Sequence, residues 1–175
     1  VTPPLPCLGL SLEALDHQGG LITKPEARAV AISKLRLRPE HCLWDLGAGS
    51  GAISIEAAAI VTRGAIVAVE RETARCDQIR ENRRRFGIAN LEVIEADLPA
   101  GLASLPRPDR IFIGGGGKRL PAILRAAAGA LSHGGWIVVN TVLLESLHRC
   151  RRTFSALGMR PEAVLIQTSR SRSMP

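Results

Sequence analysis

The chain has 175 residues, of which 46% are hydrophobic and 22% are charged, and its formal net charge is +7 at pH 7. This length and composition indicate one globular domain with a full core, and no apolar run reaches the roughly 18 residues that a membrane span requires. The four cysteines are scattered without a C-x-x-C pair, which disfavours a zinc site or a disulfide framework and favours reduced thiols in the cytoplasm. The positive charge favours an anionic partner, which could be a nucleic acid or a polycarboxylate.

Residues 1–20 are predicted to be a lead-in or linker, and residues 21–175 to form the domain. The segment Val1–Pro6 is rich in proline and does not begin with methionine, which is typical of a linker or of a piece of a longer polypeptide. The domain is expected to begin with a helix within residues 21–35, where apolar side chains recur near helical spacing. Thr23 is the expected N-cap of this helix.

A glycine loop follows the first expected strand. The apolar run Leu43–Leu46 leads into Gly47–Gly51, and a helix is expected next, over Ile53–Val61. Glycine at alternate positions permits positive φ angles and the close approach of a ligand, and the unpaired N–H groups at a helix start favour an anionic group. The pattern predicts a site for a carboxylate or a phosphate; a purely structural turn is the alternative.

Two further expected strands end in acidic residues. Ala65–Glu70 places a carboxylate where a ribose diol would lie if the two strands are neighbours, and Leu91–Asp97 ends in an acid suited to an adenine edge. The glycine spacing G-x-G-x-G after Asp45 differs from the G-x-G-x-x-G of dinucleotide-binding proteins. It resembles motif I of the class I S-adenosylmethionine-dependent methyltransferases. A nucleoside cofactor is therefore predicted, and a methyltransferase is favoured over a dehydrogenase.

The helix expected over residues 73–86 is strongly basic and contains five arginines. A solvated helix face is the favoured interpretation, and a nucleic-acid contact is the alternative. Proteins that bind nucleic acids commonly place aromatic side chains beside the charge, and only Phe86 is available here.

A run of four glycines follows the strand expected over residues 109–113. In open α/β sheets, ligands bind outside the carboxyl ends of the strands. We therefore expect a bulky substrate to lie against the bare backbone of Gly114–Gly117, next to Lys118. A mobile connection is the alternative.

The next expected strand, Trp136–Thr141, places Asn140 at its carboxyl end, where it is a candidate site residue. His133 precedes this strand and is predicted to be a turn residue rather than a catalytic base. The alternation of strands and helices predicts an α/β fold with a mostly parallel central sheet and helices on both faces. The remaining expected elements are helices over residues 120–131 and 145–157 and a sixth strand over residues 163–169.

Four segments together resemble the decarboxylating precorrin methyltransferases of cobalamin biosynthesis, over nearly the whole chain from about residue 17. The resemblance implies a Rossmann-like class I methyltransferase fold whose final antiparallel strand is missing from this chain. It also implies methylation of carbon 15 of a precorrin macrocycle by S-adenosyl-L-methionine, coupled to decarboxylation of the acetate side chain on carbon 12. Members of this family are typically homotetramers, and some are fused to an N-terminal precorrin methylase domain. The segments are Ile22–Val30, Asp45–Gly51, Phe112–Gly115 and Val139–Glu145.

Candidate site residues follow from the strand ends and from this resemblance. No metal ligand is predicted, since the sequence offers no metal cluster. The catalytic residues stay unassigned, and few acid–base groups are required, because the resemblance implies a conjugated macrocycle that can itself act as nucleophile and as electron sink. The candidate cofactor-binding residues are Thr23, Gly47, Ala48, Gly49, Ser50, Gly51, Glu70, Ala96, Asp97, Leu98 and Gly114. The candidates for binding the anionic tetrapyrrole are Lys24, Arg28, Gly115, Lys118, Asn140 and Glu145.

Two other functions stay open at this point. An RNA methyltransferase is favoured by the basic balance and disfavoured by the scarcity of aromatic residues, and its binding would weaken steeply with salt. A non-catalytic nucleoside-binding domain would bind the cofactor without turnover. Of the partners considered, neither a nucleic acid nor a membrane is expected.

Overall fold

The computed structural model describes residues 4–16, 23–169 and 171 of the chain. Strands and helices alternate, and the five strands form one sheet in the order β3-β2-β1-β4-β5. The strands are β1 (Cys42–Leu46), β2 (Ala65–Glu70), β3 (Leu91–Glu95), β4 (Arg110–Ile113) and β5 (Trp136–Val139). The helices are α1 (Pro25–Leu35), α2 (Ala52–Ala57), α3 (Thr73–Arg85), α4 (Leu120–Ala130) and α5 (Leu144–Ala156), with short 3-10 turns η1 (Leu102–Ser104) and η2 (Gly117–Arg119).

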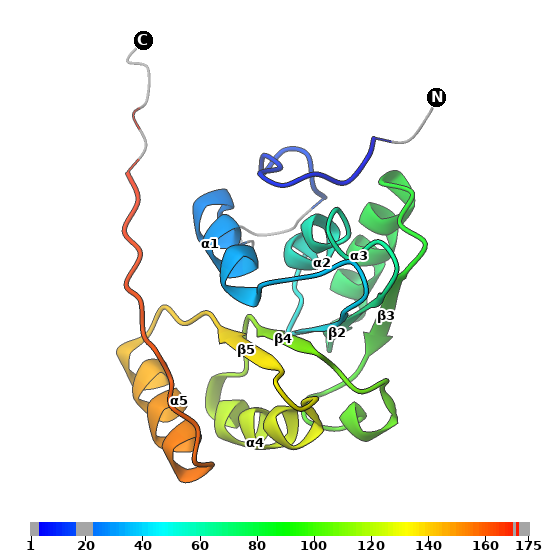
Figure 1. Cartoon of the computed structure of the whole chain (residues 1–175). Helices are drawn as coiled ribbons and strands as arrows, with labels where there is room; N and C mark the ends of the chain where they lie inside the picture. The colour runs from blue at the N-terminus through cyan, green and yellow to red at the C-terminus, as the bar shows by residue number, and fades with distance from the viewer. Residues whose placement is uncertain (1–3, 17–22, 170, 172–175) are drawn as a thin grey trace.

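Every pair of neighbouring strands is parallel, so all five carboxyl ends lie at one edge of the sheet. Helices α1, α2 and α3 cover one face, and α4 and α5 cover the other (Figure 1). This arrangement is the α/β fold with a parallel sheet that the alternation of elements predicts, and it is Rossmann-like, as the resemblance implies. The order of strands reverses direction at β1, between β2 and β4, which is where ligands bind in sheets of this kind.

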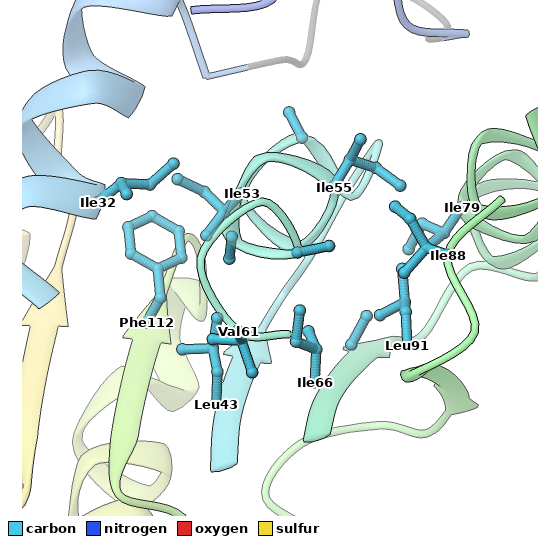
Figure 2. Packing of buried hydrophobic residues seen from close by; sticks show 14 of the residues in the cluster. Ile32, Leu43, Ile53, Ile55, Val61, Ile66, Ile79, Ile88, Leu91 and Phe112 are labelled. Atoms are coloured by element: carbon cyan, nitrogen blue, oxygen red, sulfur yellow. The ribbon is translucent and has the colours of Figure 1, made fainter. Parts of the chain in front are cut away.

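Side chains of β1 alternate between the two faces of the sheet, because successive residues of a strand point in opposite directions. Leu43 joins Ile53 and Ile79 in the core beneath α1, α2 and α3 (Figure 2). Trp44 faces α4 and α5, is fully buried, and donates its indole N–H to the carbonyl oxygen of Pro106 at 2.9 Å. Asp45 lies on the same face as Leu43 and is also buried, at 1% exposure.

The basic helix α3 neutralises much of its own charge. Arg75, Arg80 and Arg84 each form an ion pair with an acid three residues earlier in the chain. Pairs of this spacing lie on one face of a helix, and they are exposed to solvent at Arg80 and Arg84. The geometry is that of a solvated helix face.

Three expectations about local structure are wrong. The N-cap of α1 is Lys24 rather than Thr23, and no side chain caps the helix. Helix α2 is six residues long and ends at Ala57, before the predicted Val61. The third error is the sixth strand: residues 159–169 form neither helix nor strand. A strand needs a neighbour, but no strand among the described residues pairs with this segment, which leaves α5 as an extended chain (Figure 1), with Leu165 93% exposed.

Within residues 4–16, 23–169 and 171, we find no helix with both the length and the apolar character needed to cross a bilayer.

Candidate ligand-binding cleft

A large cleft lies along the carboxyl ends of the strands. Its volume is about 1550 Å³, and its walls include residues that follow each of the five strands. Most pockets for small ligands measure about 300–1,000 Å³, so this cleft has room for more than one small molecule. One further wall is the extended segment after α5, from Met159 to Thr168.

The glycine loop forms the floor of the cleft at the end of β1. Gly47, Gly49 and Gly51 have φ angles of 72°, 59° and 74°, a left-handed conformation that is strained for other residues. The amides of Gly47 and Ala48 donate to the carbonyl oxygen of Val69, at 2.9 and 3.1 Å, and so fix the loop to β2. A Cβ at position 47 would lie 3.3 Å from the backbone nitrogen of Gly115, so the loop also passes close to the glycines after β4.

Glu70 ends β2 and holds the glycine loop with its carboxylate. Oε2 accepts a hydrogen bond from the amide of Gly49 at 2.9 Å. Oε1 accepts from the amides of Arg71 and Glu72 at 3.0 and 3.2 Å. The side chain is only 6% exposed, yet Glu70 lines the cleft. One carboxylate therefore fixes the loop and also lies where the sequence predicts the contact with a ribose.

An ion pair joins the two sides of the cleft beyond Glu70. The guanidinium of Arg119 in η2 donates to the carboxylate of Asp97, which follows β3. This hydrogen bond lowers the pKa of Asp97. Both side chains are more than half exposed, and exposed pairs contribute little to stability, so the pair can separate at small cost. Sequence reasoning did not single out Arg119, although it directly follows the candidate Lys118.

Positive charge dominates the cleft. Among the described residues, eight basic side chains line it against three acidic ones, Glu70, Asp97 and Glu162. Four of the basic residues have an acidic partner in an ion pair, and the other four have none among the described residues. These four cations are Lys24, Lys118, Arg151 and Arg160. Because they are free to bind, the cleft suits a ligand with several negative charges.

Trp136 adds an aromatic side chain to the cleft at the start of β5. Its ring is 40% exposed and packs against the guanidinium of Arg36, whose Cζ lies 4.5 Å from the ring centroid. This cation–π contact is typical of arginine beside tryptophan. His133 lies exposed in the turn before β5 and outside the cleft, the turn position predicted for it.

Most of the candidate site residues lie together in this cleft, and three do not. Gly51 caps α2 from inside the protein, where a Cβ would lie 2.9 Å from Cγ2 of Ile79. Glu145 is exposed in the first turn of α5 and does not line the cleft, although the adjacent Leu144 does. Those that line the cleft are Thr23, Lys24, Gly47, Ala48, Gly49, Ser50, Glu70, Ala96, Asp97, Leu98, Gly114, Gly115, Lys118 and Asn140.

Arg28 is the third candidate that lies outside the cleft, and its predicted contact with the substrate is wrong. Its side chain is 0% exposed, and its Nε lies 2.7 Å from Oε1 of Glu56. A buried cation requires a paired and hydrogen-bonded setting, and the interior of the domain provides it. The signal in the sequence was Glu56 itself, the single charged residue within the stretch Ala52–Ile60.

Replacing Asp45 with asparagine is expected to remove a pH dependence of stability. Burial raises the pKa of Asp45 from 3.8 to about 6, although Ser54 donates a hydrogen bond to Oδ2 at 2.6 Å. Between these two values the folded protein holds a proton that the unfolded chain has released, so stability falls as the pH rises. The contribution of the protonated Asp45 carboxyl to the free energy of unfolding is complete below about pH 4 and is lost above about pH 6. The free energy of unfolding differs by about 3 kcal/mol between these two limits.

The measurement is the free energy of unfolding by urea from pH 4 to pH 7.5 for wild type and Asp45→Asn. The asparagine leaves a buried amide without a full set of partners, but this cost does not change with pH. Parallel pH curves for the two proteins would contradict the assignment to Asp45.

Among the described residues, no three His, Cys, Asp or Glu side chains lie close enough together to bind a metal ion.

Comparisons with known proteins agree with this geometry. The sequence profile of the precorrin methyltransferase domain matches residues 13–174. A probable cobalt-precorrin-6B C(15)-methyltransferase (decarboxylating) of Pyrobaculum calidifontis is 38% identical over 173 residues, which cover 97% of this chain and 88% of that protein. A precorrin-6Y C(5,15)-methyltransferase [decarboxylating] of Sinorhizobium is 43% identical over 130 residues, 74% of this chain but 31% of that protein. The crystal structure of precorrin-6y C5,15-methyltransferase from Geobacter metallireducens has a TM-score of 0.85 and 40% identity, and covers 88% of this chain and 82% of its own.

Proposed function

The chain belongs to the precorrin methyltransferase family, and from this premise we propose that it methylates carbon 15 of a precorrin macrocycle and decarboxylates the acetate side chain on carbon 12, in cobalamin biosynthesis. The methyl donor is S-adenosyl-L-methionine. The observation that supports this function best is the cleft itself, because a nucleoside-compatible floor and four unpaired cations share one space large enough for two ligands.

The chain has residues that fit the cofactor. Gly47 and Gly49 present bare backbone in the left-handed conformation, and the carboxylate of Glu70 lies beside them. In the proposed binding mode, the loop and Thr23 hold the methionine carboxylate, and Glu70 accepts hydrogen bonds from the ribose hydroxyls. The adenine lies at Ala96–Leu98, and Gly114 packs against the ligand from β4. Bound there, S-adenosyl-L-methionine supplies an electrophilic methyl group. Gly51 supports the loop from behind by allowing α2 to pack against Ile79.

The rest of the cleft fits a flat, polyanionic substrate. Lys24 and Lys118, predicted from the sequence, are joined by Arg151 and Arg160, and all four lack an acidic partner among the described residues. Cations placed around a site attract and orient carboxylates. Asn140 and the exposed backbone of Gly115 complete this wall.

The chain's contribution to the reaction is chiefly positional. Methyl transfer is an in-line displacement, and holding two reactants in the correct geometry can supply much of its acceleration. The new bond joins the methyl group to carbon 15, and the electron pair of the broken bond stays on the departing sulfur. In the decarboxylation, carbon dioxide leaves the acetate, and a proton replaces it on the remaining carbon. The macrocycle provides the conjugation for both steps, so the cleft needs few acid–base groups.

We further propose that the chain forms a homotetramer and works in the cytoplasm. Domains of this family also occur as part of a longer polypeptide. Val142 and Leu144, which follow β5 at the rim of the cleft, are 100% and 81% exposed, and a second copy of the chain would cover them. The Sinorhizobium relative, of which this chain spans about a third, supports fusion to another domain. Free cysteines, as at Cys7 and Cys42, suit a reducing compartment.

Incubation of the protein with S-adenosyl-L-methionine and a precorrin is expected to add one methyl group and remove carbon dioxide. Mass spectrometry of the product measures both changes at once. A methyl gained without loss of carbon dioxide would contradict the decarboxylation. An unchanged substrate mass, with the cofactor bound, would contradict the whole assignment and favour an RNA substrate. Binding of RNA should weaken steeply when the salt concentration rises from about 50 to about 200 mM.

A further inference from the structure

The buried ion pair between Arg28 and Glu56 connects α1 to α2. Both side chains are 0% exposed, and Nε and Oε1 are 2.7 Å apart. Burying two charges costs free energy that their attraction often fails to offset, so replacing such a pair by apolar residues is frequently neutral or stabilising. Stability alone therefore does not explain why this pair lies in the core.

The guanidinium reaches two stretches of backbone besides Glu56. Nη1 donates to the carbonyl oxygen of Thr23 at 3.0 Å, and Nη2 donates to the carbonyl oxygen of Leu10. Glu56 completes the contact, because its Oε1 also accepts a hydrogen bond from the amide of Leu10 at 2.8 Å. A planar guanidinium can bond in three fixed directions, whereas the ammonium of lysine is a compact charge at the end of a flexible chain.

These contacts link the glycine loop to the part of the cleft wall that Thr23 and Lys24 form. Glu56 belongs to α2, whose N-cap is Gly51, the last residue of the glycine loop. Thr23, held by Arg28, lines the cleft together with Lys24. Helix α2, the side chains of Glu56 and Arg28, and the carbonyl group of Thr23 therefore form a continuous path. This path sets the distance between the glycine loop and the Thr23–Lys24 wall.

We propose that Arg28 and Glu56 are positioning residues: their buried pair holds the Thr23–Lys24 backbone against the cleft at a fixed distance from the glycine loop. This inference rests on the proposed function, because Thr23 is assigned there to the cofactor and Lys24 to the substrate. Neither Arg28 nor Glu56 touches a ligand, and both act through the backbone that they hold.

Two variants test the proposal. Arg28→Met/Glu56→Leu replaces the pair with apolar side chains of similar size and is expected to keep the fold. Arg28→Lys keeps a cation beside Glu56 but loses the fork that reaches Thr23 and Leu10. A displacement of about 1 Å at a reacting group can cost about 100-fold in rate. We therefore expect kcat/KM to fall by about 100-fold in the double variant, and the affinity for S-adenosylhomocysteine by about tenfold. At a temperature where Arg28→Lys is fully folded, we expect its kcat/KM and its affinity for S-adenosylhomocysteine both to be lower than those of wild type.

The control is Arg63→Gln/Glu40→Gln, which removes an exposed pair outside the cleft and should leave both readouts unchanged. Should the double variant fail to fold, Arg28→Lys decides the question. A folded variant of either kind with wild-type kcat/KM and wild-type affinity for S-adenosylhomocysteine would overturn the proposal. Calorimetric titration with S-adenosylhomocysteine needs no precorrin. If wild type fails to convert the macrocycle, the proposed function fails, while the positioning role is still judged from the loss of this affinity.

Discussion

Replacing Glu70 with alanine is expected to weaken the binding of S-adenosyl-L-methionine by about 10- to 100-fold. The carboxylate accepts hydrogen bonds from three backbone amides, those of Gly49, Arg71 and Glu72, and it is the proposed acceptor for the ribose. Hydrogen bonds to charged groups contribute about 1.5–3 kcal/mol each. The variant loses the contact with the ligand and also releases the loop that cradles it. Isothermal titration calorimetry with S-adenosylhomocysteine measures the change.

Glu95→Ala is the matched control for this experiment. Glu95 ends the neighbouring strand β3, is paired in register with Glu70, and is exposed. Its removal should change the affinity less than twofold, which is the ordinary effect of a surface substitution. Glu70→Gln is informative as well, because one orientation of the amide places an N–H group opposite the Gly49 N–H. Wild-type affinity in folded Glu70→Ala would rule out the ribose contact.

Replacing Gly115 with alanine is expected to lower kcat/KM by about 10- to 100-fold while leaving the melting temperature nearly unchanged. Gly115 lies outside the left-handed conformation, and a Cβ there would meet no atom within 4 Å. The fold therefore has no need for glycine at this position. The added methyl group would point into open space at the cleft wall where the macrocycle is proposed to lie, and would displace it from the cofactor.

Gly114→Ala distinguishes a glycine that the fold requires from a glycine that the substrate requires. A Cβ at position 114 would lie 3.1 Å from Cε1 of Phe112 and 3.2 Å from the carbonyl oxygen of Gly47, so this variant should lose stability as well as activity. Steady-state kinetics and thermal unfolding of both variants give the comparison. Full activity in Gly115→Ala would place the substrate elsewhere in the cleft.

Much of the fold and of the cleft could be predicted from the sequence, because the residues at the strand ends indicate where the strands stop and which of them face a ligand. Apolar runs that stop at Gly47, at Glu70 and at Gly114 indicate buried parallel strands with ligand-facing ends, and the structure gathers all three in one cleft. Parallel pairing alone is enough to bring these ends to one edge of the sheet.

The errors at Arg28 and in the segment after α5 have a common physical origin, since both depend on a partner distant in the sequence. Arg28 resembles any surface arginine until Glu56 is known to face it. The run Ala163–Ser169 has the composition of a strand, but composition does not supply a neighbouring strand, and residues 159–169 remain unpaired. Arg160 enters the cleft because of the direction that the chain takes after α5, and Arg151 because of where α5 itself packs; no local pattern records either.

The two tryptophans give the protein two separate optical probes. The chain has no tyrosine, so its ultraviolet emission comes chiefly from Trp44 and Trp136. Trp44 is sealed in the core and should emit at short wavelength until the protein unfolds, whereas Trp136 lies half in water against Arg36. A conjugated ligand seated beside Trp136 would quench its emission by energy transfer. Trp136→Phe leaves Trp44 as the single tryptophan, whose short-wavelength emission reports folding, and the difference from wild type isolates the response of Trp136 to occupancy of the cleft.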